Sequence, residues 1–168
     1  ILEHFPLSTI LRPSIVYSVD DNFTTTFMSM LSKLPIFPLY YSGETKFMPI
    51  HCSDLTDTII HIISKNIYSK IIECAGPEII TFKEILQRLL KLINKRRILV
   101  PLPLPLAEMS ARLFEIMPKP ILTRDQCEIL SEADNVVSNE YLTIKDLDLD
   151  PSDVEQEMKK WLWRYRDG

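Results

Sequence analysis

Short apolar segments alternate with amphipathic helical patterns along this chain, and that alternation limits its fold more than any other feature. Continuous apolar character predicts buried strands at Thr9–Leu11, which Arg12-Pro13 stops, and at Lys70–Ala75. The order strand–helix–strand–helix–strand–helix, followed mostly by helices, predicts an α/β fold with a parallel component. The other expected elements are extended segments at Ile36–Tyr41, Lys46–Cys52 and Arg97–Pro101, and helices at Phe23–Leu34, after Ser53 or Asp54, at Pro105–Met117, at Thr123–Leu130 and after Asp150–Asp153.

Capping signals and apolar stripes mark the helices. Thr81 and Glu84 form a capping box, in which the threonine caps the helix and the glutamate is its third residue. Apolar residues recur at spacings of three and four in each helix, so we expect those residues to face the core. The expected core residues are Leu55, Ile59, Ile62 and Ile63 in the second helix, Phe82, Ile85, Leu86, Leu89, Leu90 and Ile93 in the third, and Val154, Met158, Trp161, Leu162 and Tyr165 in the last.

The charge balance excludes nucleic acid as a partner. The chain of 168 residues has a net charge of -4 and a pI near 5.4, and its longest basic run is Lys95–Arg97. We expect that run to follow a helix C-terminus, where positive charge complements the helix dipole. The apolar fraction of 46% and charged fraction of 25% are typical of a globular protein with one core or one incomplete domain.

Cysteine usage and hydropathy point to a cytoplasmic protein. Cys52, Cys74 and Cys127 show no zinc-site or redox-site spacing, and their apolar neighbours predict buried free thiols. The most apolar stretch, Ile98–Leu122, contains five prolines and several charges, so we do not expect it to span a membrane.

The sequence lacks a complete catalytic apparatus. The three glycines, Gly43, Gly76 and Gly168, are isolated, so neither a dinucleotide fingerprint nor a phosphate loop is possible within this chain. His51 and Asp54 stand three residues apart, which could suit acid–base work, but aspartate there is better explained as a helix N-cap. We therefore assign no catalytic residue and no metal ligand.

Three segments carry a family resemblance. Thr9–Tyr17, with its strand ending in Arg-Pro and its Val-Tyr pair, resembles the extended and atypical short-chain dehydrogenase/reductases, the NAD-dependent epimerase/dehydratase superfamily. Lys46–Asp54 is similar to that family's next strand, and Glu73–Glu84 to its entry into the following helix. The resemblance implies that an NAD(P) cofactor of the intact fold is contacted through Pro13, Ser14, Ile15 and Val16.

Later segments narrow the resemblance to one branch. Val100–Pro103, Ile121–Gln126 and Asp134–Val137 are similar to the branch that contains the nucleotide-binding accessory subunit of respiratory complex I and its alphaproteobacterial relatives. This implies that residues 1–168 are the C-terminal half of a Rossmann-like NAD(P)-binding domain with a small, mostly helical substrate-side or partner subdomain. The Gly-rich N-terminal half would be absent, so the isolated chain is expected not to bind NAD(P), and to aggregate or oligomerise through exposed strand edges.

Two departures from the family leave three hypotheses for function. The chain has no Tyr-x-x-x-Lys pair, and Val16-Tyr17-Ser18-Val19 replaces the family's Val-Tyr-Gly-Pro. The first hypothesis is a complex I accessory-subunit-like protein, not catalytic on its own, whose partners are its missing half or respiratory subunits. The second is the substrate-binding part of an active NAD(P)-dependent epimerase or reductase. The third is a non-enzymatic module that docks on a subunit or on the inner membrane surface through Ile98–Leu122 and Trp161–Arg166, unless those residues simply cover the core.

Overall fold

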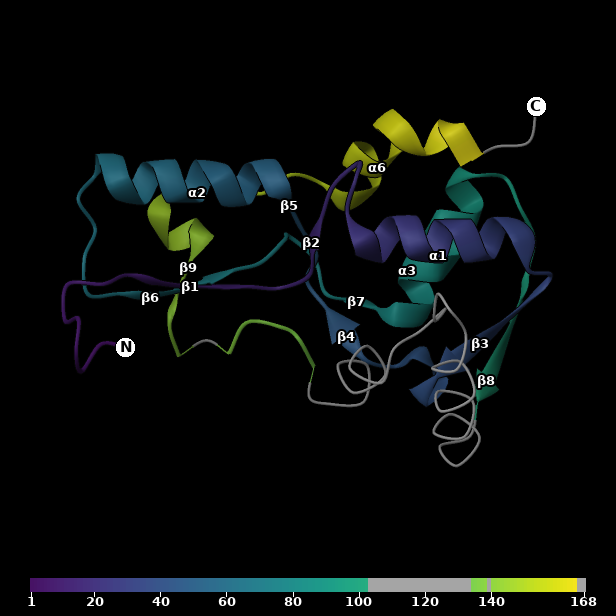
Figure 1. The fold of residues 1–168 in the computed structure, drawn as a ribbon, viewed down its shortest axis with the longest axis horizontal. Coiled ribbons are helices and arrows are strands. Elements are labelled where there is room, and N and C mark those ends of the chain that lie inside the picture. The colour runs from purple at the N-terminus through teal and green to yellow at the C-terminus, as the bar shows by residue number, and fades with distance from the viewer. Residues whose placement is uncertain (103–133, 139, 166–168) are drawn as a thin grey trace. The chain divides into compact units, whose positions relative to one another are not determined.

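The computed structural model describes residues 1–102, 134–138 and 140–165, and the chain divides into two compact units (Figure 1). Each unit is built from segments that are far apart in the sequence. Unit 1 comprises Ile1–Asp21, Phe47–Ile79 and Asn135–Met158, and unit 2 comprises Asn22–Lys46, Ile80–Asp134 and Lys159–Gly168.

A parallel sheet forms the centre of unit 1. Its strands are β1 (Ile10–Pro13), β6 (Ile71–Cys74) and β9 (Leu142–Thr143), in the order β1-β6-β9. A second parallel pair joins β2 (Val16–Tyr17) to β5 (Ile50–His51). These strands confirm the predicted α/β fold with parallel pairing.

From the sequence we expected Arg12 and Pro13 to stop the first strand, but both residues belong to β1. The backbone N–H groups of Ile10 and Ser14 donate to Lys70 and Cys74 of the neighbouring segment, at 2.8 and 2.9 Å. In parallel pairing, alternate residues face one neighbour, so the N–H that Pro13 lacks would point away from β6. The proline therefore removes no hydrogen bond from the sheet.

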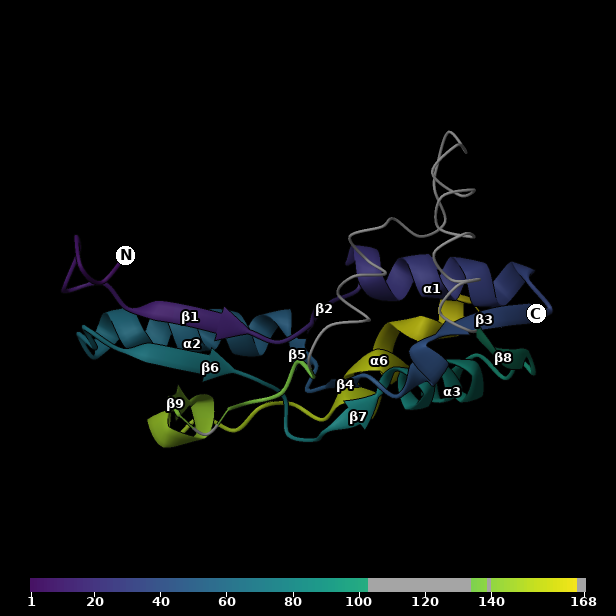
Figure 2. The same cartoon turned by 90° about the horizontal axis from the view of Figure 1, so that it is seen from below.

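Helix α2 (Cys52–Ser64) covers one face of this sheet, and Figures 1 and 2 show it running alongside β1 and β6. Our prediction was correct for Ile62 and for the partly buried Leu55, but wrong for Ile59 and Ile63, which are 40% and 70% exposed. Successive helical residues are rotated by about 100°, so these two side chains project from the flank of the helix. The core of unit 1 consists of Ile50, Ile62, Ile72, Cys74, Ile144 and Leu147, with Leu11, Val16, Leu55, Ile67 and Leu149 packed against it.

An aromatic cluster holds unit 2 together. It joins α1 (Asn22–Lys33), β3 (Ile36–Tyr40) and α3 (Phe82–Leu92). Phe27 lies at its centre, with its ring centroid 4.8 Å from Phe23, 5.0 Å from Phe82 and 6.0 Å from Phe37, all edge-to-face. β3 pairs in parallel with β8 (Ile98–Leu102).

The capping box at the start of α3 is confirmed. The Glu84 backbone N–H donates to the Thr81 hydroxyl at 3.2 Å, and the Thr81 backbone N–H donates to the Glu84 carboxylate at 2.8 Å. Hydrogen bonds from the Thr81 backbone and hydroxyl lower the pKa of Glu84. All six predicted core positions of this helix and its C-cap are buried.

The basic run after α3 has a specific partner. The Arg97 guanidinium donates to the carbonyl oxygens of Leu31 and Ser32 at 2.8 and 3.1 Å. These carbonyls lie in the last turn of α1, where helix carbonyls have no partner within the helix. The run does follow a helix C-terminus, as predicted, and Arg97 caps a different helix from the one it follows.

The remaining elements include several that the sequence did not predict. The strand β9, the turn η2 (Ile144–Leu147) and the short strand β7 (Ile80–Thr81) were not expected. The last helix, α6 (Val154–Leu162), is confirmed, and all of its expected core residues are buried except Tyr165, which is partly buried. The further elements are η1 (Tyr41–Gly43), β4 (Lys46–Phe47) and η3 (Trp163–Tyr165).

Some expectations fall outside the described residues or are wrong. The helices predicted at Pro105–Met117 and Thr123–Leu130, and Cys127, lie outside them. Cys74 is buried, and burial raises the pKa of its thiol to about 11. The prediction for Cys52 was wrong: this thiol, on the first residue of α2, is exposed.

We predict that Phe27→Ala destabilises the chain by about 3–5 kcal/mol, because it leaves a cavity among three aromatic rings. Urea unfolding followed by circular dichroism measures the effect. The matched control is Phe5→Ala, since Phe5 is 66% exposed and should change stability by less than about 0.5 kcal/mol. Equal effects of the two substitutions would contradict the described aromatic core.

Candidate functional site

The loop that follows β1 is the best candidate site in unit 1. It consists of Ser14 and Ile15, flanked by Pro13 at the end of β1 and Val16 at the start of β2, and the sequence implied cofactor contact for these four residues. The loop begins where β1 ends, beside the carboxyl end of β6. In open parallel sheets, ligands bind outside the carboxyl ends of the strands, so the position itself suits a binding loop.

The side chain of Ser14 is committed to the protein's own backbone. Its hydroxyl donates to the Asn135 carbonyl at 3.0 Å and accepts from the Met48 N–H at 3.2 Å. Its backbone N–H donates to the carbonyl of Cys74, and the residue is 9% exposed. Ser14 therefore ties together three segments that are remote in sequence, and its hydroxyl serves structure.

The other three residues of the segment, Pro13, Ile15 and Val16, differ in their pairing and in the exposure of their side chains. Val16 pairs with Ile50 in the β2–β5 sheet and packs against the core of unit 1. The Ile15 carbonyl accepts from the Ile50 N–H at 2.9 Å. Pro13 is exposed and Ile15 is half-buried, so these are the loop side chains that remain available to a ligand.

Gly76 supports the loop from the neighbouring strand connection. Its N–H donates to the Met48 carbonyl at 3.0 Å. A Cβ placed at this position would collide with the carbonyl oxygen of Pro49. The glycine is therefore required by the close approach of two backbone segments.

Tyr17 ends the loop with a buried hydroxyl. The side chain is 1% exposed, its ring centroid is 5.2 Å from that of His51, and no described residue is hydrogen-bonded to its hydroxyl. Burial raises the pKa of Tyr17, and the nearby carboxylates of Asp54 and Glu157 raise it further. The phenol therefore stays protonated and cannot serve as a base near neutral pH.

His51 and Asp54 do not form an acid–base pair, and the predicted roles at this helix start need correction. His51, rather than Asp54, is the N-cap of α2: its Nδ1 accepts from the Ser53 N–H at 3.4 Å. Asp54 lies in the first turn, where its carboxylate accepts from the backbone N–H and the hydroxyl of Ser152 at 2.9 and 2.8 Å. The helix starts earlier than expected because β5 leads directly into it, which leaves Asp54 to anchor a distant segment.

Two polar contacts of β1 and β6 were missed by sequence reasoning. The buried Glu73 accepts from the N–H and hydroxyl of Ser138 at 2.8 and 2.9 Å. The Arg12 guanidinium lies 4.7 Å from the centre of the Tyr141 ring, a cation–π contact. Nothing local in the sequence signals either pair, because their members are more than sixty residues apart.

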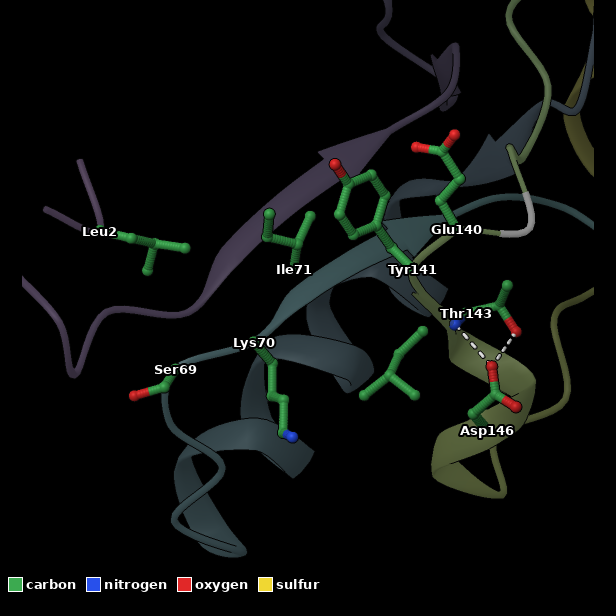
Figure 3. A pocket seen from close by; sticks show the side chains of 9 residues that line it. Leu2, Ser69, Lys70, Ile71, Glu140, Tyr141, Thr143 and Asp146 are labelled. Atoms are coloured by element: carbon green, nitrogen blue, oxygen red, sulfur yellow. Dashed lines mark hydrogen bonds between the residues drawn. The ribbon is translucent and has the colours of Figure 1, made fainter.

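A shallow open pocket of about 720 Å³ lies elsewhere in unit 1, around the start of β6 (Figure 3). Figure 3 shows Asp146 held by Thr143, whose N–H and hydroxyl donate to it at 2.7 and 2.8 Å. These bonds lower the pKa of Asp146. The pocket includes none of residues 13–16, and it is lined by Leu2, Ser69, Lys70, Ile71, Glu140, Tyr141, Leu142, Thr143 and Asp146.

The described residues offer neither a metal-binding cluster nor a membrane-spanning helix. These contain no cluster of three or more His, Cys, Asp or Glu side chains that could hold a metal ion. Within the same residues, no helix combines the length and apolar character needed to cross a membrane.

Comparison with curated proteins finds relatives that align with nearly the whole chain. It is 28% identical to NADH dehydrogenase [ubiquinone] 1 alpha subcomplex subunit 9 of Arabidopsis thaliana, across 100% of this chain and 44% of that protein. The chain is 26% identical to the protein of the same name in Dictyostelium discoideum, across 99% of this chain and 47% of that protein. The 40 kDa subunit of NADH-ubiquinone oxidoreductase of Neurospora crassa is 27% identical, over 96% and 42%. The chain thus spans less than half the length of these relatives, and no protein-family model matches it.

Comparison with solved structures identifies the fold. The UDP-glucose 4-epimerase of Thermotoga maritima matches with a TM-score of 0.60 at 12% identity, over 98% of this chain and 48% of that one. The dTDP-glucose 4,6-dehydratase of Bacillus anthracis, solved in complex with NAD, matches with a TM-score of 0.61 at 13% identity, over 94% and 43%. The chain therefore has the α/β fold of about half of each of these epimerase and dehydratase structures.

We predict that Ser14→Ala destabilises the chain by about 1–3 kcal/mol, because it leaves the Met48 N–H and the Asn135 carbonyl without their shared partner. Chemical unfolding measures the loss. The control is Ser64→Ala, which removes an exposed hydroxyl that bonds the His61 carbonyl within its own helix. An unchanged midpoint for Ser14→Ala would show that its hydroxyl does not join the three segments.

In contrast to Ser14→Ala, Tyr17→Phe should not destabilise the chain. Because no described residue hydrogen-bonds the Tyr17 hydroxyl, removing this buried group should leave stability unchanged or raise it by up to about 1–3 kcal/mol. Thermal unfolding of the two proteins gives the comparison, with Tyr68→Phe as the exposed control. A clear loss of stability would mean that the Tyr17 hydroxyl has a partner in solution.

Proposed function

We propose that this chain, a distant homologue of subunit 9 of the NADH dehydrogenase alpha subcomplex, is part of an accessory subunit of an NADH:ubiquinone oxidoreductase. Its role there would be structural or in assembly, with a nucleotide-binding fold and no turnover of its own. Its partners would be other subunits of that respiratory complex.

The observation that carries this proposal is the extent of the alignment. Relatives from a plant, an amoeba and a fungus, each named as a subunit of the same oxidoreductase, match 96–100% of the chain. The solved epimerase and dehydratase structures match at much lower identity and support the fold alone.

The candidate site supports a role without catalysis. The Ser14 hydroxyl is occupied by two backbone groups, and Asp54 is occupied by Ser152. Burial keeps the Tyr17 phenol protonated. Of these three side chains, Ser14 and Asp54 are therefore committed to structure and Tyr17 is unable to act as a base.

We further propose that the chain supplies the C-terminal half of a Rossmann-like domain. β1 is an edge strand of the described sheet, so a further strand could pair along its open edge as far as Pro13, which has no N–H to donate there. A Gly-rich half would bind the cofactor's phosphates, and Pro13 and Ile15 would contact NAD(P) from this side. The relatives' greater length supports this arrangement.

The test is association in the native cell. Expressed with an affinity tag in the cells it comes from, the protein should migrate on native gels with a particle that stains for NADH dehydrogenase activity. Migration as a small free species, together with NADPH-dependent turnover by the purified protein, would favour an epimerase or reductase and overturn the proposal.

A variant pair tests the cofactor contact in the same preparation. Ile15→Asp places a carboxylate in the proposed contact, whereas Val19→Asp makes the same change at a nearby exposed position. We expect Ile15→Asp to lower the NAD(P) content of the isolated particle at least tenfold, measured by extraction and enzymatic assay, with Val19→Asp unchanged. Equal cofactor content in both variants would exclude Ile15 from the contact and leave the assembly role standing.

A further inference from the structure

Charge is strongly segregated in unit 2. Two segments, residues 22–43 and 85–102, contain six cationic side chains and no aspartate or glutamate, although the whole chain has a net charge of -4. They form α1, β3, the body of α3 and β8. The six cations are Lys33, Arg88, Lys91, Lys95, Arg96 and Arg97.

The sheet formed by these segments exposes an apolar face. β3 and β8 lie side by side in parallel (Figure 1), with Ile36 opposite Ile98 and Pro38 opposite Val100. Ile36, Ile98 and Val100 are 54%, 62% and 41% exposed. The alternate residues Phe37 and Leu39 are buried, so the strands have one core face and one outer face, and both are apolar.

The apolar face and the cations meet at the amino ends of the two strands. The Ile98 N–H donates to the Pro35 carbonyl at 3.1 Å, which brings the start of β8 against the start of β3. Arg97 fixes this junction through the carbonyls of Leu31 and Ser32. Lys33 and Arg96, both exposed, therefore flank the outer isoleucines.

We propose that this surface docks on an anionic lipid bilayer, with Ile36, Ile98 and Val100 entering the interface and Lys33 and Arg96 contacting the lipid headgroups. Apolar side chains bordered by lysine and arginine are the combination that binds such surfaces. Three apolar side chains are too few for the core of a stable protein interface, which needs about 800 Å² from each partner. The absence of carboxylates from both segments provides the charge complementarity.

The proposal is independent of the accessory-subunit role, because its readout is binding to lipid vesicles alone. The full chain is mixed with vesicles of phosphatidylglycerol and phosphatidylcholine, or of phosphatidylcholine alone, and sedimented. We expect binding to the anionic vesicles, which weakens as salt is raised, and little binding to the neutral ones. Equal binding to both kinds, or to neither, would overturn the proposal.

Matched charge variants locate the surface. Lys33→Gln with Arg96→Gln should weaken binding about 25-fold, since each cation near an anionic leaflet contributes about fivefold. The control, Lys65→Gln with Lys70→Gln, removes two exposed cations of unit 1 and should leave binding unchanged. A loss of the same size in the control would show that binding follows net charge and would contradict the assignment.

Matched apolar variants test insertion. Ile36→Thr with Ile98→Thr keeps β-branched residues in the strands, so the fold should survive, as circular dichroism checks. Binding should weaken at least tenfold, whereas Ile60→Thr with Ile63→Thr, equally exposed on α2, should bind as the parent does. If the first pair binds undiminished, or if a single-stranded oligonucleotide binds as tightly as the vesicles, the surface is a general polyanion site and the proposal is wrong.

Discussion

The parallel pairing of β1 with β6 is the interaction on which unit 1 depends. It aligns Ile10 with Ile71 and Pro13 with Cys74, so residues about sixty positions apart end at the same level of one sheet. The aligned strand ends position the loop after β1, where Ser14 is hydrogen-bonded to Cys74, Met48 and Asn135. The same pairing turns Ile72 and Cys74 toward α2 and so creates the core.

Local features of the sequence predicted local structure well. The Thr81–Glu84 capping box and the stripe of α3 were correct, because both depend on neighbours within one or two turns of helix. The strands β1, β6 and β8 were also correct to within two residues, since each is a short, mostly apolar segment. Contacts over long separations were not predictable: Glu73 with Ser138, and β6 with β9, have no local signal.

Errors at α2 share one physical cause. Helical spacing alone predicted that Ile59 and Ile63 face the core, but the face of α2 that packs on the sheet depends on where β5 ends and the helix begins. Because β5 leads directly into α2, His51 is the N-cap and Asp54 binds a distant segment. For the candidate site, the sequence resemblance suggested residues 13–16, and only the structure revealed that the Ser14 hydroxyl and the Val16 side chain face the protein's own backbone and core.

The order in which the chain is synthesised gives the Asp54–Ser152 contact a further consequence. Unit 1 draws on three stretches of sequence, and its last stretch supplies β9, the partner of Glu73 and the partner of Asp54. On the ribosome, the first two stretches emerge long before the third, leaving the second edge of β6 and two carboxylates unsatisfied. Because such non-local closure is slow and exposes strand edges, the nascent chain should depend on chaperones until residues 138–152 have left the exit tunnel.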